Sequence, residues 1–354
     1  MKQPALGLFG TGFMVLVALA FIKLFSFPFF MDWVAYVLTC MVPVELMVCV
    51  LWQSKASESI EKLGQPGKGI LLTLFVAVVG SVIAAAALYT VGGGMTPPTP
   101  ILNLYVISIV CFAFFVLFVL KGWPFTLIPN RFISGLTFLA GLHAIGYGLF
   151  RLFFNFGFMS AAPFYSPALA PHGMFNAWVA LTFYVAVVAA IMIALSFDLW
   201  PLTSNPKLMS PRTLPFVWGA AALVTALALF AAFVNGLKLD VVVVMVRLLI
   251  AFVFGTIIVL IVFQGSLFAG VKQPLKGVLN VLTAAVAGGG LSIVYVYVSP
   301  LLCGMKLPGG APQYVQEVWL ASALLAVTFP FLSGLAGLFD FWPLLRTHGD
   351  AQGK

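Results

Sequence analysis

The sequence has 354 residues, of which 63% are apolar and only 7% are charged. A soluble globular domain carries about 25% charged residues because its surface must be hydrated, so this composition excludes a soluble protein and predicts a chain that lies mostly in lipid. The net charge of +8 does not indicate a nucleic-acid partner, because the basic residues are spread over short segments between apolar runs.

Ten apolar runs follow one another along the chain, each near the roughly 20 residues that a helix needs to cross a hydrocarbon core about 30 Å thick. We predict an all-α integral membrane protein with ten transmembrane helices, at residues 6–27, 32–52, 69–91, 102–120, 132–154, 174–197, 214–235, 241–263, 276–299 and 317–341. The first run is long and lacks a small-residue cleavage site, so we expect it to remain as the first span.

Loops that contain Lys and Arg alternate with loops made mostly of Pro, Gly and aromatic residues. Twelve of the seventeen basic residues fall on one side of the predicted membrane: Lys2, Lys55, Lys62, Lys68, Lys121, Arg131, Lys207, Arg212, Lys272, Lys276, Arg346 and Lys354. Short cytoplasmic loops are enriched in Lys and Arg. Both termini are therefore expected to be cytoplasmic, in a multi-pass protein of the cell inner (cytoplasmic) membrane.

A Trp-Pro pair closes several apolar runs, in FDLWPL (197–202), FDFWPL (339–344) and, more loosely, LKGWPF (120–125). Each copy falls at the expected cytoplasmic end of an even-numbered span. Trp favours the headgroup level of a bilayer, and Pro ends a helix because it has no N–H to donate and clashes with the preceding turn. The pair therefore indicates a membrane anchor and a helix stop.

Two of these elements also carry an aspartate where the helix ends, Asp198 and Asp340. The helix dipole disfavours an anion at that position by about 0.3–1 kcal/mol. We therefore expect each carboxylate to have a cationic partner in a neighbouring loop, such as Arg212, Lys207 or Arg346.

Tryptophans at similar positions indicate an internal repeat. Trp52, Trp123, Trp200 and Trp342 are separated by 71, 77 and 142 residues, and a constant period would place the missing member near Ser266. A period that contains an even number of spans predicts five tandem helical hairpins of like orientation within one transmembrane domain. Their approximate bounds are 1–55, 66–123, 129–200, 211–268 and 274–344, followed by a cytoplasmic tail at 345–354. The alternative is that Trp anchors and short loops give any ten-span protein an apparent period.

Small residues gather in the odd-numbered spans, for example at 84–87 and 284–290. Small side chains let helix backbones approach closely, and this drives helix association in lipid, where the hydrophobic effect cannot. We expect the odd-numbered spans to pack through these residues, and the Phe-rich even-numbered spans to face lipid or to fill gaps between hairpins.

Ionisable side chains inside the apolar runs are the first candidates for function, because placing them in hydrocarbon is costly. Glu45 lies near the middle of the second span, two residues after Pro43. Arg247 lies about 9–12 Å below the outer end of the eighth span at 1.5 Å per residue, so an ion pair with Glu45 is within reach. One hypothesis is a proton- or ion-linked site at Glu45 gated by Arg247. The other is a structural pair, or an arginine that extends outward and a glutamic acid that stays protonated.

The histidines differ in their expected depth. His143 is expected at mid-membrane in the fifth span, whereas His172 opens the sixth span at the outer face. A haem held by two imidazoles needs both at a similar depth, and these two differ by about half the bilayer. His143 is therefore a candidate for the lining of a solute path, and His172 is a weak candidate for cofactor binding.

Three consecutive glycines, Gly288, Gly289 and Gly290, stand inside the ninth span. Each weakens a helix by about 1 kcal/mol relative to alanine. Close helix packing is one explanation. The other is an unwound segment that lines a solute path, with hydroxyl groups supplied by Tyr295 and Tyr297.

No catalytic or metal-binding motif is present. The four cysteines lack the paired spacing of zinc and iron-sulfur sites, and three histidines with nine carboxylates are too few for a histidine-rich di-iron or copper centre. Nucleotide-binding and hydrolase motifs are also missing. We therefore expect no catalytic centre, metal site or cofactor in this chain itself.

Two hypotheses about function follow. The first is an inner-membrane permease or channel that moves a small, weakly polar or proton-coupled solute along a path lined by Glu45, Arg247, His143, Gly288–Gly290 and Tyr295; it predicts a polar cavity at mid-membrane and purification alone or as a homo-oligomer. The second is a membrane subunit of a larger redox complex that passes electrons to quinone. It predicts a dry interior and partner subunits, and only here is haem or quinone expected. In both cases the chain lies in the lipid bilayer and binds no nucleic acid.

Overall fold

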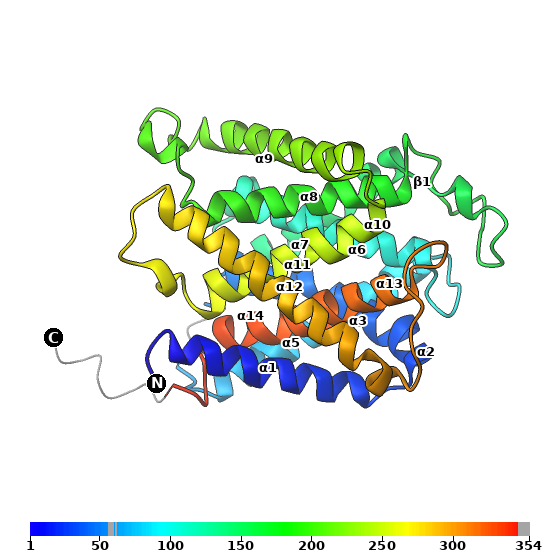
Figure 1. Ribbon diagram of the computed structural model, residues 1–354, viewed down its shortest axis with the longest axis horizontal. Helices are drawn as coiled ribbons and strands as arrows, with labels where there is room; N and C mark the ends of the chain where they lie inside the picture. The colour runs from blue at the N-terminus through cyan, green and yellow to red at the C-terminus, as the bar shows by residue number, and fades with distance from the viewer. Residues whose placement is uncertain (56–59, 61, 346–354) are drawn as a thin grey trace.

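The computed structural model describes residues 1–55, 60 and 62–345. Ten helices among these residues are long and apolar enough to cross a membrane, which confirms the predicted number of spans. We number these spans 1 to 10 in chain order. They lie side by side, roughly along the horizontal direction of Figure 1.

The odd-numbered spans are mostly single helices. Spans 1, 3, 5 and 9 are α1 (Ala5–Lys23), α5 (Gly67–Thr90), α7 (Arg131–Phe153) and α12 (Leu275–Cys303), and span 7 joins α9 (Leu214–Phe230) to the π-helical turn η7 (Ala231–Gly236).

The even-numbered spans are more often composite. Span 2 is α2 (Phe27–Phe29), η1 (Phe30–Val34), α3 (Ala35–Leu46) and η2 (Met47–Leu51); span 4 is α6 (Pro100–Phe114) and η3 (Phe115–Val119); span 6 is α8 (Ala177–Ser196). Span 8 is α10 (Val241–Val243), η8 (Val244–Ile250), α11 (Ala251–Ile257) and η9 (Ile258–Val262); span 10 is α13 (Val315–Ser322), η11 (Ala323–Thr328) and α14 (Phe329–Gly337). Short 3₁₀ turns lie in the loops as η4 (Phe125–Leu127), η5 (Gly157–Met159), η6 (Leu202–Ser204) and η10 (Ser266–Phe268), and β1 (Phe154–Asn155) pairs in parallel with β2 (Phe175–Asn176).

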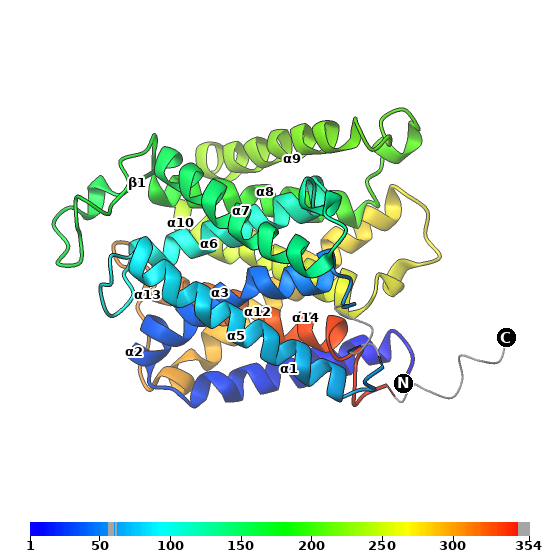
Figure 2. The same ribbon diagram turned by 180° about the vertical axis from the view of Figure 1, so that it is seen from behind.

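The even-numbered spans form the interior of the bundle. Between 56% and 72% of the residues in their apolar windows are buried, against 22–33% in the odd-numbered spans. Figure 2 shows α5 and α7 on the outside of the molecule, and Figure 1 shows α1, α9 and α12 there. Of the two places expected for the Phe-rich even-numbered spans, facing lipid is not what the structure shows, whereas their large side chains do fill the space between the outer spans.

The inner spans contact one another in chain order and close into a ring. α3 packs on α6, α6 on α8 and α8 on η8; η8 then packs on α13, and η11 returns to α3. Each outer span also packs against the inner span that precedes it, as α5 does on α3 and α12 on α11, and α1 packs against α14 at the end of the chain.

A repeated pentapeptide fastens three outer spans to a second inner span. The pattern Gln-Pro-x-x-Gly occurs at 3–7, 65–69 and 273–277. A Cβ at Gly7, Gly69 or Gly277 would overlap the ring of Phe263, Phe339 or Phe197, respectively, at the end of span 8, 10 or 6. The preceding glutamine side chain accepts from the glycine N–H in each copy. Each of these outer spans therefore lies in the groove between two neighbouring inner spans.

The remaining outer spans, 5 and 7, also dock against inner spans, but through other contacts. In span 5, a Cβ at Gly135 would lie 2.6 Å from the Trp52 ring, and the indole N–H of Trp52 donates to the Arg131 carbonyl at 2.8 Å. In span 7, a Cβ at Gly219 would lie 3.4 Å from Val119. We call this end of the bundle, which holds Trp52, Trp123, Trp200 and Trp342, the Trp end; α1 also begins here (Figure 1).

The aspartates at the Trp end are held by the outer spans. Lys276 Nζ lies 2.8 Å from Asp198 Oδ2, and Gln273 donates to the same oxygen at 2.9 Å. Partial burial raises the pKa of Asp198, but these hydrogen bonds outweigh it and hold the pKa below its ordinary value. The expected cation is therefore present, although it is Lys276 and not Lys207 or Arg212, because α12 docks directly on the end of α8. Asp340 accepts from Gln65 at 3.0 Å, and Arg346 lies outside the described residues.

Candidate functional site

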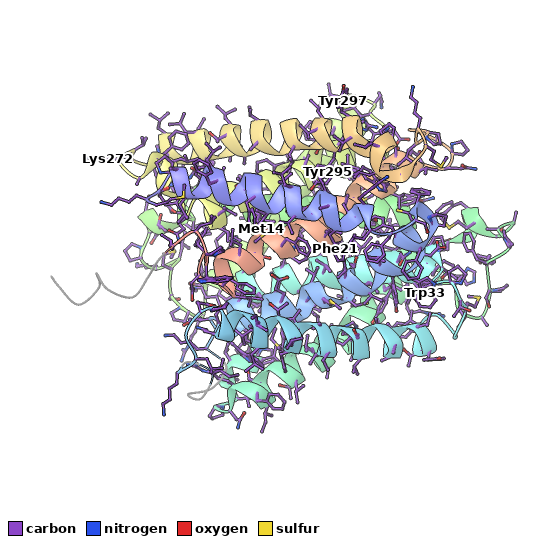
Figure 3. The ribbon with its side chains drawn as sticks, turned by 90° about the horizontal axis from the view of Figure 1, so that it is seen from below. Met14, Phe21, Trp33, Lys272, Tyr295 and Tyr297 are labelled. Atoms are coloured by element: carbon purple, nitrogen blue, oxygen red, sulfur yellow. The ribbon has the colours of Figure 1, made fainter. Side chains whose placement is uncertain are left out.

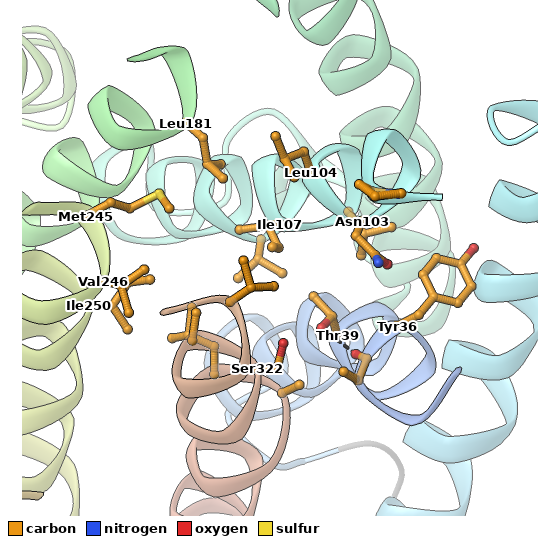
Figure 4. Close-up of a pocket in the computed structure, with 18 of the residues that line it drawn as sticks. Tyr36, Thr39, Asn103, Leu104, Ile107, Leu181, Met245, Val246, Ile250 and Ser322 are labelled. Atoms are coloured by element: carbon orange, nitrogen blue, oxygen red, sulfur yellow. Dashed lines mark hydrogen bonds between the residues drawn. The ribbon is translucent and has the colours of Figure 1, made fainter. Parts of the chain in front are cut away.

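A cavity of about 810 Å³ lies inside the ring of inner spans. All five inner spans contribute to its wall, for example through Thr39, Leu104, Leu181, Val246 and Ser322 (Figure 4). No outer span contributes a lining residue. The cavity is thus a product of the ring and is the candidate functional site.

The cavity begins among the loops at the end opposite the Trp end. Pro98, Phe158, Phe164 and Pro312 line it there, together with Trp178 in the first turn of α8. Phe158 is about half exposed (48%). This part of the wall, which we call the mouth, is formed by segments from four different loops and helix ends.

The cavity stops within the bundle. Its deepest lining residues include Phe114 and Phe329, whose ring centroids lie 6.1 Å apart. From Pro100 to Phe114 the wall follows α6 for about 21 Å at 1.5 Å per residue. Beyond this floor Met47, Val119 and Val262 are fully buried, so packed side chains separate the cavity from the Trp end.

The cavity wall is mainly apolar, with a few polar groups near the mouth. Among the described residues, Asp32 is the one charged residue that lines it. Asn103 and Ser322 lie further in, and Figure 4 shows both facing the space between α6, α3 and α13. Thr39 also lines the wall, but its hydroxyl donates to the Ala35 carbonyl at 2.6 Å. The polar mid-membrane cavity expected for a permease is therefore replaced by one whose floor is apolar.

Glu45 lies just beyond the floor, not in the wall. Val42 and Phe329 line the cavity, and Glu45 and Ser333 follow them by about one helical turn on the same two spans. The Ser333 hydroxyl donates to Glu45 Oε1 at 2.6 Å, and Glu45 is only 4% exposed. A buried carboxyl group in hydrocarbon is costly and therefore marks a functional candidate.

Arg247 does not reach Glu45. Its Nε and Nη2 donate to Glu317 Oε1 at 3.0 and 2.6 Å, and Nη2 also donates to Gln316. Glu317 is 1% exposed, and its second oxygen accepts from the Gly310 N–H at 3.0 Å. Arg247 extends toward the Val315 end of span 10, where its charge is paired near the mouth, and so it joins spans 8 and 10 instead of lining the cavity.

A second polar contact ties the same region together. Tyr314, which precedes α13, donates its hydroxyl to Asp240 Oδ2 at 2.7 Å, and Asp240 also caps α10 through the Val242 and Val243 N–H groups. The hydrogen bond to the carboxylate raises the pKa of Tyr314 to about 12. Pro312 and Gln313 line the mouth and directly precede Tyr314. The hydrogen bond from Tyr314 to Asp240 therefore anchors one end of the loop that carries them.

The two histidines are not brought together. His143 Nδ1 lies 3.0 Å from the Tyr105 hydroxyl between α7 and α6, and its Nε2 is buried with no hydrogen-bond partner in the described part of the chain. His172 is exposed in the loop before β2, and its backbone forms an isolated antiparallel β-bridge with Asn155. Neither lines the cavity. Among the described residues no three His, Cys, Asp or Glu side chains gather as a metal site requires.

Of the glycine run, only Gly288 packs span 9 against a neighbouring helix, and Tyr295 also belongs to this packing. α12 is continuous through all three glycines. A Cβ at Gly288 would overlap the Ala251 carbonyl, whereas Gly289 and Gly290 face open space. Tyr295 is fully buried and meets the Thr328 hydroxyl at 2.6 Å, while Tyr297 is 85% exposed and points outward (Figure 3).

Sequence reasoning missed Asn103, Ser322 and Glu317. Each is a polar residue in the first turns of an apolar span. Polar residues are common at that position, near a membrane boundary, so none of them indicated a site by itself. The available signal was that such residues recur at the same end of even-numbered spans, but only the ring places them around one space.

Comparison with protein-family models, curated proteins and solved structures finds no match to this chain.

Proposed function

We propose that the protein is a multi-pass permease or channel of the inner membrane that passes a small, weakly polar solute through the ring of inner spans. The observation that carries the proposal is the cavity itself, which extends from the mouth to an apolar floor and stops one turn short of the buried Glu45. A site reached from one end and closed toward the other is what alternating access or a closed gate requires.

Glu45 is the proposed proton-linked residue. Ser333 has one hydroxyl hydrogen and three acceptors in reach: Glu45 Oε1 at 2.6 Å, the Phe329 carbonyl at 2.9 Å and, more distant, the Pro330 carbonyl at 3.4 Å. If Glu45 carries a proton, that proton can instead be donated to the serine oxygen, which leaves the serine hydrogen free for the Phe329 carbonyl. Because Phe329 forms the floor, loss of that proton alters the hydrogen bonds of the turn that closes the cavity.

We further propose that the chain is built of five tandem hairpins with both termini in the cytoplasm. The repeated docking of outer spans at the Trp end and the closed order of the inner spans support a repeat. The excess of Lys and Arg at the Trp end supports the orientation. The ring is complete in one chain, and a homo-oligomer would place further copies around its outer spans.

A flux measurement in proteoliposomes tests the function. Glycerol, acetamide and urea serve as uncharged solutes, acetate and methylammonium as ions, and a trapped pH dye reports proton movement. We expect flux of at least one uncharged solute above that of empty vesicles. Glu45→Gln should abolish the associated proton movement, while Asp340→Asn, which also removes one carboxylate but lies at the Trp end, should not. Equal proton movement with and without Glu45 would remove it from the mechanism.

The second candidate is a membrane subunit of a larger redox complex, and the apolar lining of the cavity is the observation that favours it. Such a lining suits a quinone or another lipophile better than a strongly polar solute. Haem or flavin would then reside on partner subunits. Gentle affinity purification tests this proposal: stoichiometric partner chains with haem or flavin absorbance would support it, and a pure single chain without absorbance would contradict it.

A further inference from the structure

The cavity changes from polar to apolar along its depth. Asp32, Gln313 and the indole of Trp178 lie at the mouth, and Asn103 and Ser322 lie one to two turns inside. From Asn103 to Phe114 the wall then runs for about 16 Å along α6 at 1.5 Å per residue. The floor is apolar: Val42, Val188 and Ile257 lie there beside the two phenylalanines.

Deeper than the mouth, two polar side chains of the cavity wall have no hydrogen-bond partner in the described part of the chain. The side-chain amide of Asn103 and the hydroxyl of Ser322 make no hydrogen bond to other described residues, although both line the cavity. The amide both donates and accepts, and the hydroxyl does so too. Together they offer hydrogen bonds to an uncharged hydroxyl, carbonyl or amide group.

The cavity offers little to an ion. No cationic side chain in the described part of the chain lines it, and the nearby guanidinium of Arg247 is already paired with Glu317. Asp32 is at the mouth, far from the floor. The free backbone N–H groups at the helix ends near the mouth are partly used by the helix caps, since the side chains of Thr99 and Asn176 accept from them. Fewer of these donors therefore remain for an anion. Moving an unpaired charge into such a site is much more costly than moving a neutral polar group.

We propose that the ligand of this cavity is an uncharged single-headed amphiphile, whose hydroxyl, carbonyl or amide group binds between Asn103 and Ser322 and whose apolar body lies against the floor at Phe114 and Phe329. The proposal rests on the proposed function and names its substrate class. The volume of about 810 Å³ lies within the range of sites for drug-sized molecules, about 300–1,000 Å³.

Photo-crosslinking in lipid nanodiscs tests the proposal. The probe is decanol that carries a diazirine at the end of its chain, and labelled residues are mapped by mass spectrometry. We expect saturable labelling at Phe114, Phe329 and Val188, displaced by excess decanol and displaced about tenfold less well by decanoate or decylammonium. Labelling of Val286, which is 75% exposed on span 9, reports the probe dissolved in lipid and should not saturate.

Matched variants separate binding from folding. Asn103→Ala combined with Ser322→Ala should lower saturable labelling about tenfold, the loss of two hydrogen bonds of about 0.7 kcal/mol each. Asn235→Ala and Ser81→Ala remove the same groups from exposed positions and should change nothing. Unchanged labelling in the cavity variant, or equal displacement by either ion, would overturn the proposal.

The same experiment distinguishes this proposal from the function on which it rests. Glycerol or urea flux without saturable labelling would support the permease but refute an amphiphile as its substrate. Saturable labelling without flux of any solute would leave an amphiphile-binding protein and refute the permease.

Discussion

The Ser333 hydroxyl bonds to the Glu45 carboxyl group at 2.6 Å and joins spans 2 and 10 directly beyond the cavity floor. The two residues are 288 positions apart in the sequence. Both are buried, so neither can exchange its partner for water without a movement of the surrounding helices.

Removing the serine hydroxyl should destabilise the fold. Ser333→Ala leaves the buried Glu45 without its hydroxyl partner, and we expect a loss of about 1–3 kcal/mol in the free energy of unfolding. Glu45→Gln keeps an acceptor for the hydroxyl and should cost less. Unfolding in mixed micelles measures both, with the exposed Ser81→Ala as control. A Ser333→Ala variant as stable as the control would show that the contact contributes nothing.

The ion pair between spans 8 and 10 gives a second prediction. Arg247→Ala should cost about 1–3 kcal/mol, because it leaves the carboxylate of Glu317 buried and unpaired. Replacing both residues, as Arg247→Met with Glu317→Gln, should cost less than the sum of the single changes. A double-mutant cycle of unfolding free energies measures the coupling, and additive costs would contradict the pairing.

The glycine run gives a prediction with a built-in control. Gly288→Val should push spans 8 and 9 apart and destabilise the protein by about 1–3 kcal/mol, because the new side chain would overlap the backbone of Ala251. Gly289→Val meets open space and should be tolerated. Thermal unfolding of both variants is the measurement, and equal effects at the two positions would refute the packing role.

The repeated Gln-Pro-x-x-Gly element predicts a similar contrast. Gly69→Val should lower stability because its side chain would overlap the Phe339 ring, whereas Gly67→Val, in the same turn, has space. Phe339→Ala introduced together with Gly69→Val should restore part of the loss. Failure of that rescue would mean that Gly69 is required for some reason other than this contact.

The pair Asp198–Lys276 predicts a pH dependence. The pKa of Asp198 is lower in the folded state than its ordinary value of 3.8, so the pair stabilises the fold above that value and the contribution is lost as pH falls through the folded pKa. Asp198 is 58% exposed at its side chain, so the stabilisation is about 0.2–1 kcal/mol. The Tm difference between wild type and Asp198→Asn should be present at pH 7, shrink below about pH 4 and shrink at high salt. A difference independent of pH would exclude the ion pair as its cause.

The sequence by itself determined the ten spans, because helix length and lipid thickness are local constraints that a run of apolar residues satisfies or fails alone. It also marked Glu45 and Arg247 as costly residues. Only the tertiary structure decided that the even-numbered spans are inside, that Arg247 pairs with Glu317, and that Asn103 and Ser322 face one cavity. These outcomes depend on which helix faces meet around a closed ring, and residues far apart in the chain, 70 positions for Arg247 and Glu317 and 288 for Glu45 and Ser333, set that relationship without leaving a local pattern.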